Sequence, residues 1–404
     1  MRYGLIGNPL GHSWSPKIHA LLGDYEYGLY PLEKEELASF LGQKDLGGLN
    51  VTLPYKKEVL PFCSGLSDAA QKIGCVNVLR FTPEGIFGDN TDCDGFLYMV
   101  RRSGIAFEGR KVLVLGSGGA SLTARYCASL LGAGQIVTIS RKGPDDYAHL
   151  DRHRDAQIII NTTPLGMYPD NESQALSLAE FPKLEGVLDV VYNPLRTAII
   201  QQAQEMGIPC SAGLPMLVAQ AVAASERFMG NRIPDEKTEQ VLSAIRSDIE
   251  NIVMIGMPGC GKSTIGLELE KMTGRKLVDL DNMIEEENGC SIPEIITTKG
   301  EEFFRDLETE AVCRWAKQSG LIIACGGGTP LRERNRRLLR QNGMVFWLQR
   351  ELSLLPTEGR PLSVDLEKLE NVRRPVYEAA SDAQIDNNGP AQETAKRILE
   401  VFGK

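Results

Sequence analysis

Short apolar runs recur along the chain, and each is followed by a turn of glycines or small polar residues and then by an amphipathic stretch. This alternation is typical of buried parallel strands that lead through a loop into a helix, and it predicts an α/β protein. The predicted strands cover residues 5–7, 49–53, 111–115, 136–139, 158–160, 187–191, 252–255, 276–278 and 322–324. The predicted helices cover residues 17–22, 214–229, 235–245, 264–272 and 331–340, with a further helix that ends at 131 and another that begins after Pro54.

Composition and charge narrow the class of protein. The 404 residues suggest two to three domains of about 150 residues each. The chain is 42% hydrophobic and 24% charged, as globular proteins usually are, and its net charge of -9 argues against a nucleic-acid partner. No apolar run approaches the ~18 residues of a membrane span, and no signal stretch opens the sequence. Its nine cysteines are scattered without a Cys-x-x-Cys pair, so we expect a cytoplasmic protein with reduced thiols.

The strongest single motif directly follows the apolar run 252–255. It reads Gly256, Met257, Pro258, Gly259, Cys260, Gly261, Lys262 and Ser263, with Thr264 continuing into the predicted helix, and it fits the phosphate-loop pattern G-x-x-x-x-G-K-[ST]. The glycines allow backbone N–H groups to curl around an anion, and the N-terminus of the helix adds positive potential. The motif therefore predicts that a nucleoside triphosphate binds here, with Lys262 at the β- and γ-phosphates and Ser263 helping to hold Mg²⁺.

A second glycine-rich turn follows the predicted strand 111–115. Its residues form a dinucleotide-binding turn with serine at the third glycine position, namely Gly116, Ser117, Gly118, Gly119, Ala120 and Ser121. NAD-binding folds place an acid about 20 residues further on, where it binds the ribose 2′-hydroxyl. Here that place holds Ser140, Arg141 and Lys142, and two cations without an acid suit the 2′-phosphate of NADP. A solvated basic turn is the alternative.

Polar residues also follow the predicted strands nearest the N-terminus. Ser13 and Ser15 lie where the first strand leads into a helix, which is a usual place for ligand contacts in an open α/β sheet. Capping of that helix by one of the two serines is the alternative. Lys56 directly follows the strand end that carries Asn50 and Thr52. The acidic segment 89–94 is typical of a solvated turn or a weak calcium-like loop, although it lacks the spacing of an EF-hand.

Several motifs in fixed order give residues 1 to about 247 a resemblance to the shikimate dehydrogenase family. They include Gly-Asn-Pro-Leu-Gly-His-Ser-Trp-Ser-Pro (7–16), Asn-Val-Thr-Leu-Pro-Tyr-Lys (50–56), Asp-Asn-Thr-Asp (89–92), Asn-Thr-Thr-Pro-Leu-Gly-Met (161–167) and Leu-Val-Ala-Gln (217–220), besides the glycine turn. The resemblance implies that the substrate is bound by Ser13, Ser15, Thr52, Asn77, Tyr192 and Gln220. It also implies cofactor contacts by Thr162, Met167 and Gly213, together with the glycine turn and residues 140–142.

The same resemblance implies a two-lobed fold and a reaction. We expect a substrate-binding lobe made of residues 1–95 and 214–247, and a Rossmann lobe for NADP made of residues 96–213. The implied reaction is the reversible reduction of 3-dehydroshikimate to shikimate by NADPH, with Lys56 and Asp92 as the catalytic pair. A lysine ammonium suits this role because it stabilises a developing alkoxide and can supply the proton, and an aspartate can orient it.

From residue 251 onward the chain resembles the shikimate kinase family, whose P-loop fold has a parallel sheet like that of nucleoside-monophosphate kinases. The matching segments are Asp-Leu-Asp (279–281), Phe-Arg-Asp-Leu-Glu (304–308), Cys-Gly-Gly-Gly-Thr (325–329), Gly-Arg-Pro-Leu (359–362) and Arg-Arg-Pro-Val-Tyr (373–377). The resemblance implies that Asp279 lies near Mg²⁺ and that Asp281 holds the attacking hydroxyl. It implies substrate contacts by Arg305, Gly326, Gly327, Gly328 and Arg373. Arg360 would be a catalytic arginine on a short lid.

The two resemblances together predict a bifunctional enzyme of aromatic amino-acid (chorismate) biosynthesis that makes shikimate and then phosphorylates its 3-hydroxyl with ATP. Two other functions stay open. A quinate/shikimate dehydrogenase that uses NAD, fused to a kinase, is opposed by the serine pair and by the basic turn at 141–142. A non-catalytic ligand sensor that keeps both folds is opposed by the presence of Lys56, Asp92, Lys262, Ser263 and Asp281.

Overall fold

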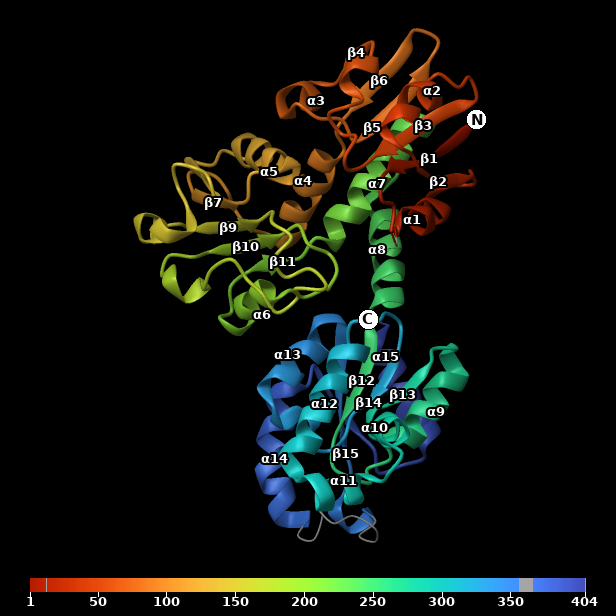
Figure 1. Ribbon diagram of the computed structural model, residues 1–404, viewed down its shortest axis with the longest axis vertical. Helices are drawn as coiled ribbons and strands as arrows, with labels where there is room; N and C mark the ends of the chain where they lie inside the picture. The colour runs from red at the N-terminus through yellow and green to blue at the C-terminus, as the bar shows by residue number, and fades with distance from the viewer. Residues whose placement is uncertain (12, 356–365, 404) are drawn as a thin grey trace. The chain divides into compact units, whose positions relative to one another are not determined.

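A computed structural model describes the chain except residues 12, 356–365 and 404. The chain forms two compact units (Figure 1), of which unit 1 comprises Met1–Asn193 and Ile199–Ile245 and unit 2 comprises Pro194–Ala198 and Arg246–Lys404. We predicted a linker just before Asn251, but the division between the units falls inside helix α8 (Asp235–Ile249), and only Glu250 separates that helix from strand β12 (Asn251–Ile255). The predicted boundaries of the two dehydrogenase lobes stay a prediction.

Within the described residues, the strands form three sheets. In spatial order, the first sheet contains β2 (Tyr27–Pro31), β1 (Arg2–Gly7), β3 (Leu46–Val51), β5 (Val78–Thr82), β6 (Gly85–Asp89) and β4 (Gly65–Leu66). The second contains β11 (Cys210–Ser211), β10 (Gly186–Asp189), β9 (Ile158–Asn161), β7 (Lys111–Leu115) and β8 (Gln135–Ile139). The third contains β13 (Leu277–Asp279), β14 (Ile322–Ala324), β12, β15 (Gly343–Gln349) and β16 (Ala383–Asp386).

Helices connect these strands. They are α1 (Ser15–Leu22), α2 (Leu37–Leu41), α3 (Asp68–Ile73), α4 (Asp92–Ser103), α5 (Gly119–Leu130), α6 (Ala198–Glu205), α7 (Leu214–Met229), α8, α9 (Lys262–Thr273), α10 (Leu280–Asn288), α11 (Ile292–Lys299), α12 (Glu301–Trp315), α13 (Glu333–Asn342), α14 (Leu366–Ala380) and α15 (Ala391–Phe402). Among the described residues, none of these helices is both long enough and apolar enough to cross a membrane.

The second and third sheets are parallel throughout, as the continuous apolar runs predicted. β7 and β12, the strands that precede the two glycine-rich turns, each pair with a strand on both sides. Every residue of β12 is buried. Figure 1 shows α12, α13 and α14 together on one side of the third sheet and α9 on the other. The loops after the strands therefore open at one edge of each sheet, where ligands bind in such folds.

The first sheet is mixed, because β5 pairs antiparallel with both β3 and β6. The helix that we predicted after Pro54 is wrong. A turn follows β3 instead, and only a short 3₁₀ helix (Leu60–Phe62) comes after it. Pro61 lacks an N–H donor, so a helix that began at Pro54 could not continue past it, and only isolated turn bonds form, such as that from the Val59 N–H to the Tyr55 carbonyl at 3.1 Å. The turn buries Tyr55 in the core and leaves the next residue, Lys56, partly exposed.

Of the alternatives left open for the acidic segment 89–94, a solvated turn does not fit the structure. The segment joins the end of β6 to the start of α4, and Asn90 and Thr91 within it are completely buried. The Asn90 amide donates from Nδ2 to the Cys75 carbonyl at 3.0 Å. The Thr91 hydroxyl accepts a hydrogen bond from Nδ2 of Asn77 at 3.2 Å, so both buried side chains have hydrogen-bond partners. The first residue of α4 is Asp92, whose negative charge suits the N-terminus of a helix.

Candidate active sites

The Lys56 ammonium and the Asp92 carboxylate form an ion pair in unit 1, with 2.5 Å between Nζ and Oδ2. Asn77 donates from Nδ2 to the other carboxylate oxygen of Asp92 at 2.9 Å. Burial by itself lowers the pKa of Lys56, but the charge of Asp92 and its hydrogen bond outweigh burial, and the net pKa is raised. The lysine is therefore protonated at neutral pH and oriented by the aspartate, as a proton donor must be.

This ion pair lies on the wall of a cavity of about 380 Å³. The structure brings every substrate residue predicted for the dehydrogenase to the same cavity, namely Ser13, Ser15, Thr52, Asn77, Tyr192 and Gln220, together with Ala120 and Gly213 of the predicted cofactor set. Asn50, which the sequence places at the same strand end as Thr52 but to which we gave no role, also lines the cavity and accepts a hydrogen bond from the Tyr27 hydroxyl at 2.7 Å. Asn50 and Thr52 are two positions apart, and residues at that spacing in a strand face the same side of the sheet, so the sequence could have indicated that Asn50 lies in the same cavity.

Helix α1 begins at Ser15, and its N-cap position is Trp14, which makes no side-chain capping bond. The alternative that Ser15 caps the helix is therefore wrong. The Ser13 Oγ accepts a hydrogen bond from the Ser15 backbone N–H at 3.2 Å, which shapes the turn and leaves the Ser13 hydroxyl hydrogen available to a ligand.

The glycine turn after β7 leads into α5 and leaves room for a ligand. Gly116 has a φ of +108°, and a Cβ added there would lie 2.9 Å from Oγ1 of Thr162. A Cβ added at Gly118 or Gly119 would meet no atom within 4 Å. The backbone at Gly118 and Gly119 is thus open on the side where a side chain would stand, which allows the close approach that a pyrophosphate requires. The residues present fit NADP in this respect.

The other predicted cofactor residues lie around this turn or on the surface. Ser117 is exposed, whereas Ser121 is 1% exposed and lies inside α5. Ser140 is half-buried at the end of β8, and Arg141 and Lys142 beyond it are exposed. Met167 is 44% exposed. Their cofactor contacts stay predictions, because these residues do not line the cavity that holds the ion pair.

The phosphate loop of unit 2 has the backbone that its glycines predict. Gly256, Gly259 and Gly261 have φ values of +146°, +80° and +96°, which only glycine adopts readily. Lys262 is the first residue of α9 and is 9% exposed. Its Nζ donates to the Gly256 carbonyl at 3.0 Å and to the Met257 carbonyl at 3.1 Å. The ammonium is therefore folded back over the loop that a phosphate would enter.

Ser263 and Asp279 supply oxygen ligands beside the loop. The Ser263 hydroxyl donates to Oδ2 of Asp279, and Oδ1 of Asp279 accepts the Asp281 backbone N–H at 3.1 Å. Mg²⁺ is usually held by one or two such groups together with phosphate oxygens and water. Among the described residues, no group of three or more His, Cys, Asp and Glu side chains is arranged to hold a metal. The residues present therefore fit an Mg²⁺ that arrives with a nucleotide.

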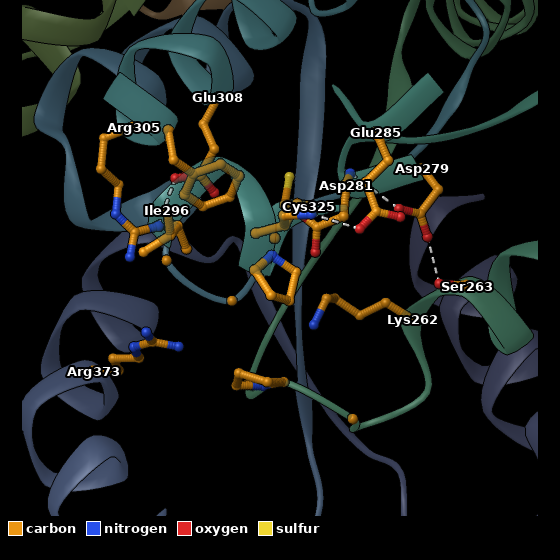
Figure 2. A pocket seen from close by; sticks show the side chains of 18 of the residues that line it. Lys262, Ser263, Asp279, Asp281, Glu285, Ile296, Arg305, Glu308, Cys325 and Arg373 are labelled. Atoms are coloured by element: carbon orange, nitrogen blue, oxygen red, sulfur yellow. Dashed lines mark hydrogen bonds and ion pairs between the residues drawn. The ribbon is translucent and has the colours of Figure 1, made fainter. Parts of the chain in front are cut away.

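The phosphate loop opens into a cavity of about 450 Å³ that is lined by all the predicted kinase residues the structure describes except Gly256, Met257 and Cys260. Figure 2 shows Arg305 and Arg373 on the side of this cavity opposite Lys262, Ser263 and Asp279. Arg305 donates from Nη1 to Glu308 at 2.6 Å. Nε and Nη1 of Arg373 are buried and have no hydrogen-bond acceptor among the described residues. An arginine with unsatisfied buried donors is suited to bind a carboxylate.

Side chains of the site approach the three glycines after β14 closely. A Cβ added at Gly326 would lie 2.6 Å from Oδ1 of Asp281, and one added at Gly327 would lie 2.9 Å from Nη1 of Arg373. At Gly328 it would lie 2.2 Å from Nη1 of Arg305. The glycines thus form the floor on which the three charged side chains converge.

Asp281 has a shifted acid–base equilibrium. Burial and then the negative charge of Glu308 raise its pKa to about 6, although Lys262 opposes this. Its Oδ1 is buried and has no partner among the described residues. A carboxylate with this pKa is suited to accept a proton near neutral pH.

Some of this cavity was not foreseen. Its wall also includes Glu285, Ile292, Pro293, Ile296, Phe304 and Cys325. The apolar members carry no chemical signal in the sequence, because they resemble any core residue until the fold brings them beside the glycines. Arg360 and residues 356–359 of the predicted lid, for which we expect the range 352–359, lie outside the described residues.

Two family models match the chain. Residues 258–402 match the model described as shikimate kinase, and residues 5–79 match the model described as shikimate dehydrogenase substrate binding domain. A shikimate dehydrogenase (NADP(+)) of Clostridium perfringens is 36% identical over 259 residues, which cover 59% of this chain and 95% of the relative. That of Methanopyrus kandleri is 34% identical over 277 residues, which cover 60% of this chain and 95% of the relative.

Solved structures are similar to the same share of the chain. A chorismate mutase/shikimate 5-dehydrogenase fusion protein from Clostridium acetobutylicum has a TM-score of 0.58 at 34% identity and covers 60% of this chain and 96% of its own. Shikimate 5-dehydrogenase from Thermus thermophilus, solved in complex with NADP(H) and shikimate, has a TM-score of 0.55 at 29% identity and covers 60% of this chain and 99% of its own. The predicted α/β fold class is confirmed. The chain belongs to the shikimate dehydrogenase family over its N-terminal part and carries a shikimate kinase domain in its C-terminal part, and it is thus an enzyme of the shikimate pathway.

Proposed function

We propose that the protein catalyses two consecutive reactions, the reduction of 3-dehydroshikimate to shikimate by NADPH and the phosphorylation of the shikimate 3-hydroxyl by ATP. The observation that carries this proposal is the convergence of each predicted set of charged residues in one cavity. Lys56 and Asp92 share one cavity, and Lys262, Asp281, Arg305 and Arg373 share another.

In the first reaction the chain's own residues bind the ring and manage a proton. Ser13 and Ser15 hold the substrate carboxylate, while Thr52, Asn77 and Gln220 contact its hydroxyls. NADPH supplies the hydride when it is bound. The Lys56 ammonium donates a proton to the carbonyl oxygen as negative charge develops there, and Asp92 keeps the lysine charged and in place.

In the second reaction the residues position and neutralise charge, as is usual in phosphoryl transfer. The guanidinium groups of Arg305 and Arg373 bind the shikimate carboxylate on one side of the cavity. Asp281 accepts a hydrogen bond from the attacking hydroxyl and takes its proton. Lys262 and the N-terminus of α9 stabilise the phosphates of ATP. Ser263 and Asp279 would hold Mg²⁺, which supplies further positive charge to the phosphate oxygens when bound.

The kinase reaction should lose rate below about pH 6, because Asp281 must be ionised to accept the proton and its pKa is raised to about 6. An ordinary aspartate would stay ionised down to about pH 4. The measurement is kcat/KM for shikimate between pH 5 and 8. Glu285 also raises the pKa of Asp281, so Glu285→Gln should move the inflection to lower pH. That variant cannot alter the titration of ATP itself, so a moved inflection assigns the titration to the enzyme, whereas a rate that is flat between pH 5 and 8 would contradict the raised pKa of Asp281.

Discrimination between NADP and NAD should depend on Arg141. Arg141 is exposed just beyond β8, where a 2′-phosphate would lie in this fold. Arg141→Ala is expected to raise the KM for NADP about tenfold, in the range of a lost charged hydrogen bond, and to leave that for NAD nearly unchanged. Steady-state kinetics with each cofactor provides the comparison, and Arg152→Ala is a control at another exposed arginine. Equal effects on both cofactors would reject the 2′-phosphate contact.

The deciding experiment supplies the purified full chain with 3-dehydroshikimate, NADPH, Mg²⁺ and ATP and identifies the products by mass spectrometry. Oxidation of NADPH with formation of shikimate 3-phosphate is expected. Absence of turnover would favour a ligand sensor. Faster turnover of quinate with NAD would favour the other dehydrogenase.

A further inference from the structure

A buried asparagine outside the phosphate loop is hydrogen-bonded to the loop backbone. Asn387 directly follows β16 and is 2% exposed. Its Nδ2 donates to the carbonyl oxygen of Cys260, 127 positions away in the sequence. The orientation of this amide is set by a second buried residue, because the Thr394 hydroxyl on α15 donates to Oδ1 of Asn387 at 3.0 Å. The Asn387 backbone N–H donates to the Gln349 carbonyl at 2.8 Å and holds the segment against β15.

This contact determines which way one peptide group of the phosphate loop faces. The C=O and N–H of a trans peptide point in opposite directions. Because the Cys260 carbonyl points to Asn387, the N–H of Gly261 points the other way. Gly261 lines the cavity and has a φ of +96°. Its lack of a side chain gives this peptide more rotational freedom than any other residue would allow, so an external hydrogen bond is needed to hold one orientation.

We propose that Asn387 is a positioning residue that keeps the Gly261 N–H directed at the nucleotide phosphates, with Thr394 holding the Asn387 amide in the donating orientation. This inference rests on the proposed binding of ATP to the loop. Asn387 does not touch the substrate cavity, so its effect on the shikimate site is indirect. Loss of the amide leaves the buried Cys260 carbonyl without its donor and frees the peptide to rotate.

The test compares two neighbouring asparagines in the full chain. Asn387→Ala should weaken MgADP binding about tenfold, which is the size of a lost buried hydrogen bond. Asn387→Asp should weaken it at least as much, because a carboxylate cannot donate to a carbonyl. Thr394→Val should have a smaller effect of about threefold. Asn388→Ala is the matched control, because Asn388 is exposed, and it should bind like the wild type. Binding is measured by titration calorimetry.

Steady-state kinetics distinguishes a specific effect of Asn387 on the phosphate loop from a general effect on the stability of the domain. The proposal requires that Asn387→Ala raise the KM for ATP while the KM for shikimate changes less than twofold, with a cooperative thermal transition retained. Equal losses for both substrates would reassign Asn387 to the fold of the domain. ADP binding within twofold of the wild type would overturn the proposal. If the wild type itself binds no MgADP, the proposed kinase function is wrong, and this inference fails together with it.

Discussion

Lys56→Ala is expected to lower the rate of NADPH-dependent reduction of 3-dehydroshikimate by about 10³-fold or more, in line with the loss of a general acid that also stabilises the developing alkoxide. Lys56 is paired with Asp92 at 2.5 Å, and its raised pKa keeps it protonated. No other lysine or arginine lines this cavity among the described residues, so no neighbouring cation replaces it. Loss of NADPH absorbance measures the dehydrogenase rate.

The neighbouring Lys57 provides the control, because it is exposed and lies outside the cavity. Lys57→Ala should keep the wild-type dehydrogenase rate. Lys56→Ala should keep the wild-type kinase rate, since Lys56 belongs to unit 1 and the phosphate loop to unit 2. If Lys56→Ala lost both activities, the variant would have unfolded or the two halves would not act independently. A dehydrogenase rate within tenfold of the wild type would remove Lys56 from the mechanism.

Lys262→Ala should abolish the kinase, with a loss of about 10³-fold or more in the rate of shikimate phosphorylation. The Lys262 ammonium is buried against two loop carbonyls, and it is the cation that a phosphate would meet first on entering the loop. A buried charge near transferring phosphates acts in a low-dielectric site, so it interacts with them much more strongly than a charge in water would. Release of ADP coupled to shikimate measures the rate.

Lys271→Ala tests whether loss of any positive charge on α9 has the same effect. Lys271 lies near the other end of the helix, and its exposed ammonium pairs with Glu268 at 2.7 Å. Exposed ion pairs of this kind contribute little to the stability of a protein. Lys271→Ala should therefore leave the kinase rate unchanged. The dehydrogenase rate of Lys262→Ala should equal that of the wild type. Retention of kinase activity in Lys262→Ala would show that the loop does not bind the donor as proposed.

Sequence reasoning succeeded where the signal was local. The strand at 111–115 and the helix at 214–229 were predicted with the bounds that the structure has. It failed at Pro54, where strand-to-helix continuity was assumed although a second proline follows closely. At 89–94 residue types alone left a solvated turn and a calcium-like loop open, since a run of acids and turn formers has the same appearance whether it is solvated or buried. The roles of individual site residues came from family resemblance, because residue types alone left alternatives such as helix capping open.

The sequence by itself determined the two glycine loops and the strands before them, because apolar runs and the backbone freedom of glycine act over a few neighbouring residues. Tertiary structure alone decided the chemical state of the site. The raised pKa of Asp281 arises from burial and from the charge of Glu308. Nε and Nη1 of Arg373 are unsatisfied because no hydrogen-bond acceptor lies beside them among the described residues. The same is true of Lys56, whose partner is 36 positions away, and of the Cys260 carbonyl, whose donor is 127 positions away. The free energy of a charge or a hydrogen bond depends on the atoms around it, and folding gathers those atoms from distant segments.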